Sequence, residues 1–260
     1  MGDSQAGKTL FVAGGSSGIN LGIARKFALE GANVALISRS PEKIEAAAKE
    51  VTALGGGKAI GMAADVRDYA AVEAALKRAH EEFGDIDTVL SGAAGNFVAP
   101  ALGMSANGFK TVVDIDLIGT FNVLRASYEF LRKPGASLIS ITAGQATRAS
   151  MYQAHVCAAK AGINMLTQCL ALEWGPAGVR VNTISPGPIA DTEGMARLAP
   201  TPEAEARVKG RVALRRYGTK DEIADMALFL SSDAASYITG AIIPVDGGSG
   251  CGDAAVGLGA

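Results

Sequence analysis

The segment AGGSSGINLG, residues 13–22, decides the fold of this chain. It joins a short apolar run, residues 9–13, to a segment of helical periodicity, residues 19–30. Gly14 and Gly18 permit a tight turn in which backbone amides approach a phosphate group at the positive N-terminus of a helix. A plain tight turn is the alternative interpretation. The position directly after the first strand favours a phosphate site, which also includes Ser16, Ser17 and Ile19.

Along the rest of the chain, short β-branched runs alternate with longer segments of helical periodicity. Strands are predicted at 9–13, 33–38, 58–63, 88–91, 137–142, 180–184 and 242–245, and helices at 19–30, 41–54, 69–83, 105–133, 152–174 and 220–230. Continuous apolar runs such as VALIS and SLISIT are typical of parallel strands covered on both faces. The pattern therefore predicts an α/β protein, with a Rossmann-type, doubly wound parallel sheet of about seven strands and helices on both faces.

The domain organisation follows from what the sequence lacks. No internal repeat, low-complexity linker or composition shift divides the chain, so we predict a single domain over residues 1–260. One long segment, residues 186–218, shows no strong periodicity and is expected to be an irregular substrate lid. The glycine-rich residues after 248 are expected to form a loose tail.

The composition argues against several classes of protein. A formal net charge of −2 indicates no basic surface for nucleic acid. No apolar run reaches the roughly 18 residues that cross a bilayer, and no targeting signal is visible. Cys157, Cys169 and Cys251 lack metal-binding spacing, so we expect neither a disulfide framework nor a metal site. These features predict a protein of the cytoplasm or of another reducing compartment.

The end of the second predicted strand indicates which dinucleotide binds. A site for NAD usually offers a carboxylate there to the ribose 2′-hydroxyl. This chain has Ser38, Arg39 and Ser40 instead, and an arginine flanked by hydroxyls suits a 2′-phosphate. Asp65, which precedes Val66, follows the third strand, where a carboxylate can accept from an adenine amino group. We predict NADPH/NADP+ as cofactor; the alternatives are a solvated charge at Arg39 and a helix cap at Asp65.

Six segments together resemble the short-chain dehydrogenase/reductase superfamily over about residues 8–248. They are GGSSGI at 14–19, DV at 65–66, AAG at 93–95, AAKAG at 158–162, VRVNTISPGPI at 179–189 and YITGAIIPVDGG at 237–248. The resemblance implies a homotetramer or a homodimer, with the cofactor lying across the carboxyl ends of the strands. It also implies further cofactor contacts from Ala93, Ala94, Gly95, Lys160, Pro186, Gly187 and Ile189.

Three positions depart from the pattern of that superfamily. The third glycine of its turn is Asn20, and we expect this residue to tolerate a left-handed backbone better than most. Ala143 stands where the family has its catalytic serine, and Val156 where it has its catalytic tyrosine. Lys160 alone remains of the usual trio, and the resemblance assigns it to the nicotinamide ribose hydroxyls.

The two missing hydroxyls bear on the type of reaction. A ketone reductase must protonate a developing alkoxide, so it needs a positioned acid beside the oxygen. Reduction of a C=C bond conjugated to a thioester instead generates an enolate or dienolate, which needs hydrogen-bond donors at the thioester oxygen. The proton then goes to carbon, and a held water can deliver it. Val156 and Ala143 therefore favour C=C reduction over carbonyl reduction.

Finer features are similar to the peroxisomal-type 2,4-dienoyl-CoA reductases, among them AAGNF at 93–97 and PGPIADTEG at 186–194. Asp116 stands where the related trans-2-enoyl reductases carry asparagine, which favours the dienoyl group. The resemblance implies that Asp116 and Asp246 orient a catalytic water. Their alternatives are a structurally paired carboxylate and a turn residue. It also places substrate-binding residues at Asn96, Phe97, Gln145 and Arg148; the alternatives are loop packing for the first two and a solvent-facing side chain for Arg148.

The expected activity is NADPH-dependent reduction of 2,4-dienoyl-CoA to 3-enoyl-CoA, in the β-oxidation of unsaturated fatty acids. Three alternatives stay open: a trans-2-enoyl-CoA or acyl-carrier reductase, a catalytically silent NADP(H)-binding protein, and an ordinary alcohol dehydrogenase. His155, next to Val156, is either a structural histidine or a residue that tunes the pocket.

Overall fold

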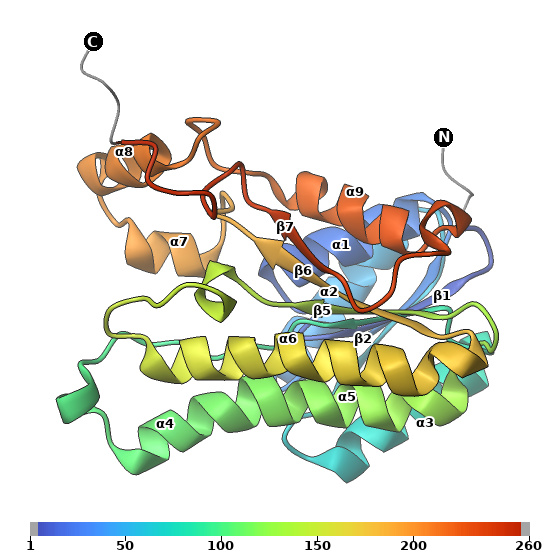
Figure 1. The fold of residues 1–260 in the computed structure, drawn as a ribbon. Coiled ribbons are helices and arrows are strands. Elements are labelled where there is room, and N and C mark those ends of the chain that lie inside the picture. Colours follow the sequence, from blue (N-terminus) through green and yellow to red (C-terminus); the bar gives the residue numbers. More distant parts are fainter. Residues whose placement is uncertain (1–4, 256–260) are drawn as a thin grey trace.

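A computed structural model describes residues 5–255, which form a parallel seven-stranded sheet between two layers of helices (Figure 1). The strand order is β3-β2-β1-β4-β5-β6-β7. The strands are β1 Thr9–Ala13, β2 Asn33–Ser38, β3 Ala59–Ala63, β4 Thr88–Ser91, β5 Ser137–Ile141, β6 Arg180–Pro186 and β7 Ile242–Val245. The helices include α1 Gly18–Leu29, α2 Pro41–Ala53, α3 Tyr69–Phe83, α4 Ala106–Val113, α5 Gly119–Ser127, α6 Ala154–Trp174 and α9 Lys220–Leu230. The predicted fold class is confirmed.

Alternating side chains of each central strand build two separate cores. Leu10 and Val12 of β1 belong to the core that packs against α1, α2 and α9, whereas Phe11 and Ala13 belong to the core beneath α3, α5 and α6. Figure 1 shows these helices on opposite faces of the sheet. Because both faces of β1 are completely covered, its sequence reads as a continuous apolar run.

β1 pairs in parallel with β2 on one side and with β4 on the other, so the strand order reverses between β1 and β4. At such a reversal the connecting helices leave in opposite directions and open a crevice at the carboxyl ends of the strands. The fold thus positions a ligand site where the glycine-rich turn, the β4 end and the β5 end meet.

The long helix predicted at 105–133 is interrupted in the structure. A π-helical segment, Asp114–Ile118, separates α4 from α5, and a short 3₁₀ turn follows at Tyr128–Phe130. A π turn changes the helical repeat, so side chains before and after it point in different directions than they would in a continuous α-helix. Such turns often occur at functional sites. The π segment carries Asp116, which is 1% exposed.

The segment predicted to be an irregular lid contains two helices, so that expectation was wrong in detail. They are α7 Glu193–Leu198 and α8 Pro202–Arg211, capped by Thr192 and Thr201. Both helices are short and strongly polar, and therefore show no apolar periodicity in the sequence.

The residues after 248 are partly tied down as far as the structure describes them. Ala254 N donates to the Arg211 carbonyl at 3.3 Å, and Asp253 lies 3.4 Å from the Arg211 side chain. The predicted loose tail is therefore not observed at residues 249–255, and residues 256–260 lie outside the described part of the chain.

Candidate active site

A cleft of about 1000 Å³ lies at the carboxyl ends of the strands. Most of the predicted cofactor residues line it: Gly14, Ser16, Ser17, Gly18, Ile19, Arg39, Ser40, Asp65, Val66, Ala93, Ala94, Gly95 and Lys160. Three predicted cofactor residues, Pro186, Gly187 and Ile189, do not line this cleft, and Ile189 borders a neighbouring hollow instead. The structure thus brings the glycine-rich turn, the ends of β2, β3 and β4, and Lys160 of α6 together in one site.

The glycine-rich turn is shaped for close approach of a ligand. Gly14 and Gly18 have φ values of 80° and 63°, which side chains rarely adopt. A Cβ on Gly14 would lie 2.8 Å from the backbone of Ala93. Ser17 occupies the N-cap of α1, but its side chain makes no capping hydrogen bond. The first amides of α1 therefore remain available to an anionic group in the cleft, as a dinucleotide phosphate requires.

Asn20 does not act as we predicted. It is an ordinary helical residue of α1 rather than one with a left-handed backbone. Its side-chain amide donates to the carbonyls of Gly14, at 3.1 Å, and Gly92, at 2.8 Å. Asn20 therefore ties the glycine-rich turn to the end of β4, and its role comes from its side chain and not from backbone freedom.

The cofactor-discriminating residues lie at the edge of the cleft, beyond β2 and β3. Arg39 is exposed there, and Ser40 caps α2 by accepting from Lys43 N at 3.3 Å. Asp65 forms an ion pair with Arg67 at 2.6 Å, and this guanidinium holds the pKa of Asp65 below its usual range. The N-cap of α3 is Asp68, so Asp65 is not the helix cap that we considered as its alternative.

A buried ion pair lies at the inner end of the cleft. Lys160 Nζ is 3.1 Å from Asp116 Oδ2 and donates to the Ile141 carbonyl at 3.2 Å. Asp116 Oδ1 accepts from Gly95 N at 2.7 Å. The pair joins α6, the π segment and the loop after β4, three elements that are remote in sequence. Asp116 is thus a paired carboxylate that also lines the cleft.

The wall around this ion pair carries no hydroxyl at the two positions where the superfamily has its catalytic serine and tyrosine. Ala143 and Val156 both line the cleft, and Val156 is 4% exposed. The adjacent Thr142 directs its hydroxyl to the Ile184 carbonyl, at 3.5 Å. Tyr152, the nearest tyrosine in the sequence, precedes α6 in a left-handed conformation, with φ of 64°, and half of its surface is exposed. The arrangement offers no phenol acid at Val156.

The predicted substrate residues are divided between the cleft and its surroundings. Asn96 and Gln145 line the cleft, and Gln145 donates to the Gln153 side chain at 3.0 Å. Phe97 stands outside the lining and packs on His155, with ring centroids 4.3 Å apart. Arg148 also lies outside it and donates to the Ser249 carbonyl at 3.0 Å.

Asp246 is not brought together with Asp116. It borders a separate hollow of about 460 Å³, near Pro188 and Leu214. Its carboxylate accepts from Gly248 N at 2.9 Å and from Gly250 N at 2.7 Å, and so holds the turn after β7. These contacts are those of a turn residue, the alternative interpretation that we gave for it.

The segment at residues 186–218 contributes cleft residues that our sequence reasoning missed. They are Asp191, Thr192, Glu193 and Gly194, to which Lys43 and Lys220 add charge from α2 and α9. Thr192 donates to the Ile189 carbonyl at 2.9 Å and caps α7. A threonine before an acidic residue is a recognised helix-start signal, and it would have indicated an ordered lid.

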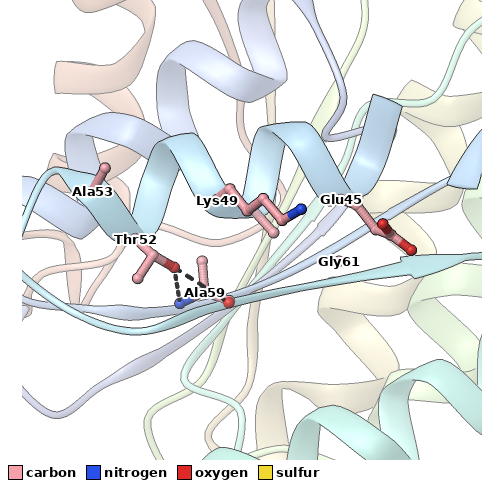
Figure 2. Close-up of a pocket in the computed structure, with 7 residues that line it drawn as sticks. Glu45, Lys49, Thr52, Ala53, Ala59 and Gly61 are labelled. Carbon is pink, nitrogen blue, oxygen red and sulfur yellow. Dashed lines mark hydrogen bonds between the residues drawn. The ribbon is translucent and has the colours of Figure 1, made fainter. Parts of the chain in front are cut away.

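A third hollow, of about 450 Å³, lies between α2 and the edge strand β3, on the outer side of the sheet (Figure 2). The Thr52 hydroxyl bonds to both backbone groups of Ala59 there, and Lys49 and Glu45 border the same groove. No orphaned buried polar atom of the described residues points into it. We therefore locate the active site in the cleft and not in this groove.

Two kinds of feature are absent from residues 5–255. No helix there is long and apolar enough to cross a bilayer, and no three His, Cys, Asp or Glu side chains are grouped to hold a metal ion.

Comparison with known proteins agrees with this geometry. Residues 13–250 match the family described as Enoyl-(Acyl carrier protein) reductase. The peroxisomal 2,4-dienoyl-CoA reductase of Rattus norvegicus, described as (3E)-enoyl-CoA-producing, is 45% identical over 244 residues, which are 93% of this chain and 83% of the relative. A probable 2,4-dienoyl-CoA reductase of Bacillus subtilis, described as (2E)-enoyl-CoA-producing, is 40% identical over 93% of this chain and 96% of its own. A crystal structure of a short chain dehydrogenase from Bacillus anthracis superimposes with a TM-score of 0.86 at 37% identity, covering 95% of this chain and 98% of the other.

Proposed function

This chain belongs to the enoyl-(acyl carrier protein) reductase family of short-chain dehydrogenases/reductases, and on that premise we propose that it reduces 2,4-dienoyl-CoA to 3-enoyl-CoA with NADPH. The observation that carries the proposal is the buried Asp116–Lys160 pair in a cleft wall where Val156 and Ala143 replace hydroxyl acids. Such a site retains a cofactor anchor and lacks the acid that protonates an alkoxide. The names of the relatives support the same substrate class.

The cleft fits a phosphorylated dinucleotide on structural grounds. The uncapped N-terminus of α1 and the glycine-rich turn suit a pyrophosphate, and Arg39 suits a 2′-phosphate. Lys160 uses its ammonium on Asp116 and Ile141, and its third proton is free for a ribose hydroxyl. When bound, NADPH supplies a hydride to the δ-carbon of the dienoyl chain.

The remaining chemistry belongs to the residues of the chain. Hydride addition leaves a dienolate, whose oxygen needs hydrogen-bond donors, and the Asn96 side chain lies in the cleft where it can donate. A water polarised by Asp116 then protonates the α-carbon and gives 3-enoyl-CoA. We propose this water because Asp116 lines the cleft and no tyrosine stands at Val156. Asp246 is also assigned to this water by resemblance, but its contacts support only a turn role.

The test is a comparison of three thioesters as substrates. NADPH oxidation is followed by absorbance with trans-2,trans-4-dienoyl-CoA, trans-2-enoyl-CoA and a β-ketoacyl-CoA, and we expect turnover of the dienoyl substrate first. Turnover of the β-ketoacyl-CoA alone would contradict the proposal. NADPH binding without any turnover would instead favour a silent nucleotide-binding protein.

The rival activity is 2-enoyl thioester reduction. Asp116 argues against it, because the resemblance gives asparagine to that group. The Bacillus subtilis relative is described as forming a 2-enoyl product, so the position of the remaining double bond must be measured in the product. A 3-enoyl product supports protonation at the α-carbon, and a 2-enoyl product places it at the γ-carbon.

Arg39 provides a test of cofactor preference. Arg39→Gln is expected to weaken NADPH binding roughly 10- to 100-fold, because a charge-assisted hydrogen bond contributes about 1.5–3 kcal/mol. NADH binding should change little, since NADH carries no 2′-phosphate. Fluorescence titration of both nucleotides measures the two dissociation constants, with Arg39→Lys as the charge-conserving control. Equal weakening of NADH and NADPH would contradict the assignment.

We also propose a homotetramer or homodimer in a reducing compartment. The helical layer of α4, α5 and α6 exposes large apolar side chains, which a second copy of the chain would cover: Phe109, Phe121, Met165 and Leu172. The three cysteines are free, which supports a reducing environment.

A further inference from the structure

His155 is a buried polar residue that the proposed reaction does not yet use. It lies in the first turn of α6 and is 0% exposed. Neither ring nitrogen has a hydrogen-bond partner of good geometry among the described residues. A buried, unsatisfied polar group is unfavourable, and in native proteins such groups usually bind ordered water. The Phe97 backbone approaches one side of the ring, so the imidazole still has a nitrogen open to a further partner.

The surroundings of His155 keep its ring neutral and fixed. Phe97 packs on it at 4.3 Å between centroids and is itself 40% exposed. Burial lowers the pKa of His155 below its usual value, against the opposing influence of the Phe97 backbone and of the Asp116 charge. A neutral imidazole has one N–H donor and one acceptor nitrogen, so it can either donate a hydrogen bond to a water molecule or accept one from it.

Asp116 has an unsatisfied oxygen in the same region. Its Oδ1 accepts from Gly95 N at 2.7 Å. Its Oδ2 makes an ion-pair contact of 3.1 Å with Lys160 but no aligned hydrogen bond, and it is buried. A carboxylate accepts about four hydrogen bonds, so Oδ2 can take a further donor.

The cleft reaches Asp116, and His155 lies just behind its wall, within the electrostatic influence of the Asp116 carboxylate. Val156 follows His155 in α6 and lines the cleft together with Asp116. Valine is much smaller than tyrosine, so its place in the wall leaves room for a water molecule near the ion pair. A site needs two to four polar partners to hold water, and His155 and Asp116 offer two.

We propose that His155 is a positioning residue, which shares a bound water with Asp116 and thereby holds the proton donor of the reaction. This inference rests on the proposed function. The water gives one proton to the α-carbon of the dienolate, and the hydroxide that remains takes a proton from solvent through the open cleft. The imidazole keeps its own proton throughout and acts only through the water.

The test compares His155→Leu, which removes both ring nitrogens, with His155→Asn, which keeps one donor and one acceptor. His155→Leu is expected to lower kcat roughly 10²-fold, the lower end of general acid–base contributions, with KM and the dissociation constant of NADPH little changed. The solvent deuterium isotope effect on kcat should increase, because proton delivery becomes slower. His155→Asn should recover at least part of kcat. An unchanged kcat in His155→Leu, or an asparagine variant no better than the leucine variant, would overturn the proposal.

A second readout does not depend on activity. The chain has two histidines, His80 and His155, so nitrogen-labelled imidazole signals are assigned by a single variant, His80→Gln. In the NADP+ complex we expect the His155 ring to be neutral and to show magnetisation transfer from a long-lived water. Absence of that transfer refutes the water site. If the wild-type protein turns over no dienoyl-CoA, the proposed function fails instead, and the nuclear magnetic resonance result still decides whether the water is there.

Discussion

Lys160→Met is expected to reduce dienoyl-CoA turnover roughly 10²- to 10³-fold, the effect of removing one pre-oriented charged donor from an active site. It should also lower the free energy of unfolding by about 3–5 kcal/mol, because Asp116 loses its counter-charge inside the protein. The side chains of Lys160 and Asp116 are 7% and 1% exposed, so bulk solvent would screen the unpaired Asp116 charge only weakly. Urea denaturation measures the free energy of unfolding, and the rate of NADPH oxidation with dienoyl-CoA measures turnover.

The double variant Lys160→Met/Asp116→Leu is the control for this prediction. Replacement of both charges by apolar groups of similar size is often neutral for stability, so the unfolding free energy should return toward the wild-type value. Turnover should not return, because both groups of the proposed site are gone. A stability loss that persists in the double variant would show that the charges matter less than packing in this part of the core.

Val156→Tyr is expected to abolish most of the dienoyl-CoA reductase activity, although it restores the residue that the superfamily usually carries. Val156 is buried and lines the cleft, so a phenol there fills the space of the water and of the thioester. Overpacking costs about 1–3 kcal/mol. Applied to substrate binding, that energy corresponds to a loss of roughly 5- to 150-fold in kcat/KM.

Two control variants separate the size of the new side chain from its hydroxyl. Val156→Phe adds the same bulk without the acid and should lose as much activity as Val156→Tyr, whereas Val156→Ile should stay close to wild type. A tyrosine variant that keeps its dienoyl activity, or that gains strong ketone reduction over wild type, would favour the alcohol dehydrogenase alternative.

The architecture could be predicted from the sequence because it rests on local periodicity. Apolar runs such as residues 33–38 can be buried only in a strand covered on both faces, and β2 occupies those residues. The helices within residues 186–218 were harder to predict from the sequence, because α8 has the sequence PEAEARVKGR and buries none of its residues. A helix without an apolar face leaves no periodic signal.

The π segment could not be predicted from the sequence. A π turn has no distinctive composition, and at Asp114–Ile118 it coincides with contacts of Asp116 to Gly95 and Lys160 that come from distant parts of the chain. Asn20 shows the same limit, because its effect depends on the Gly92 carbonyl at the end of β4. Both cases involve partners that only folding brings into reach.

The sequence by itself determined the doubly wound sheet, the position of the dinucleotide site and the absence of a hydroxyl acid at Val156 and Ala143. Each of these depends on residue types at given positions along one strand, turn or helix. The tertiary structure alone decided that Asp116 pairs with Lys160, that Asp246 holds a turn away from the cleft, and that His155 is buried against Phe97. These depend on burial and on distances between separate elements, which local patterns do not encode because a side chain's partners are fixed only when the layers pack.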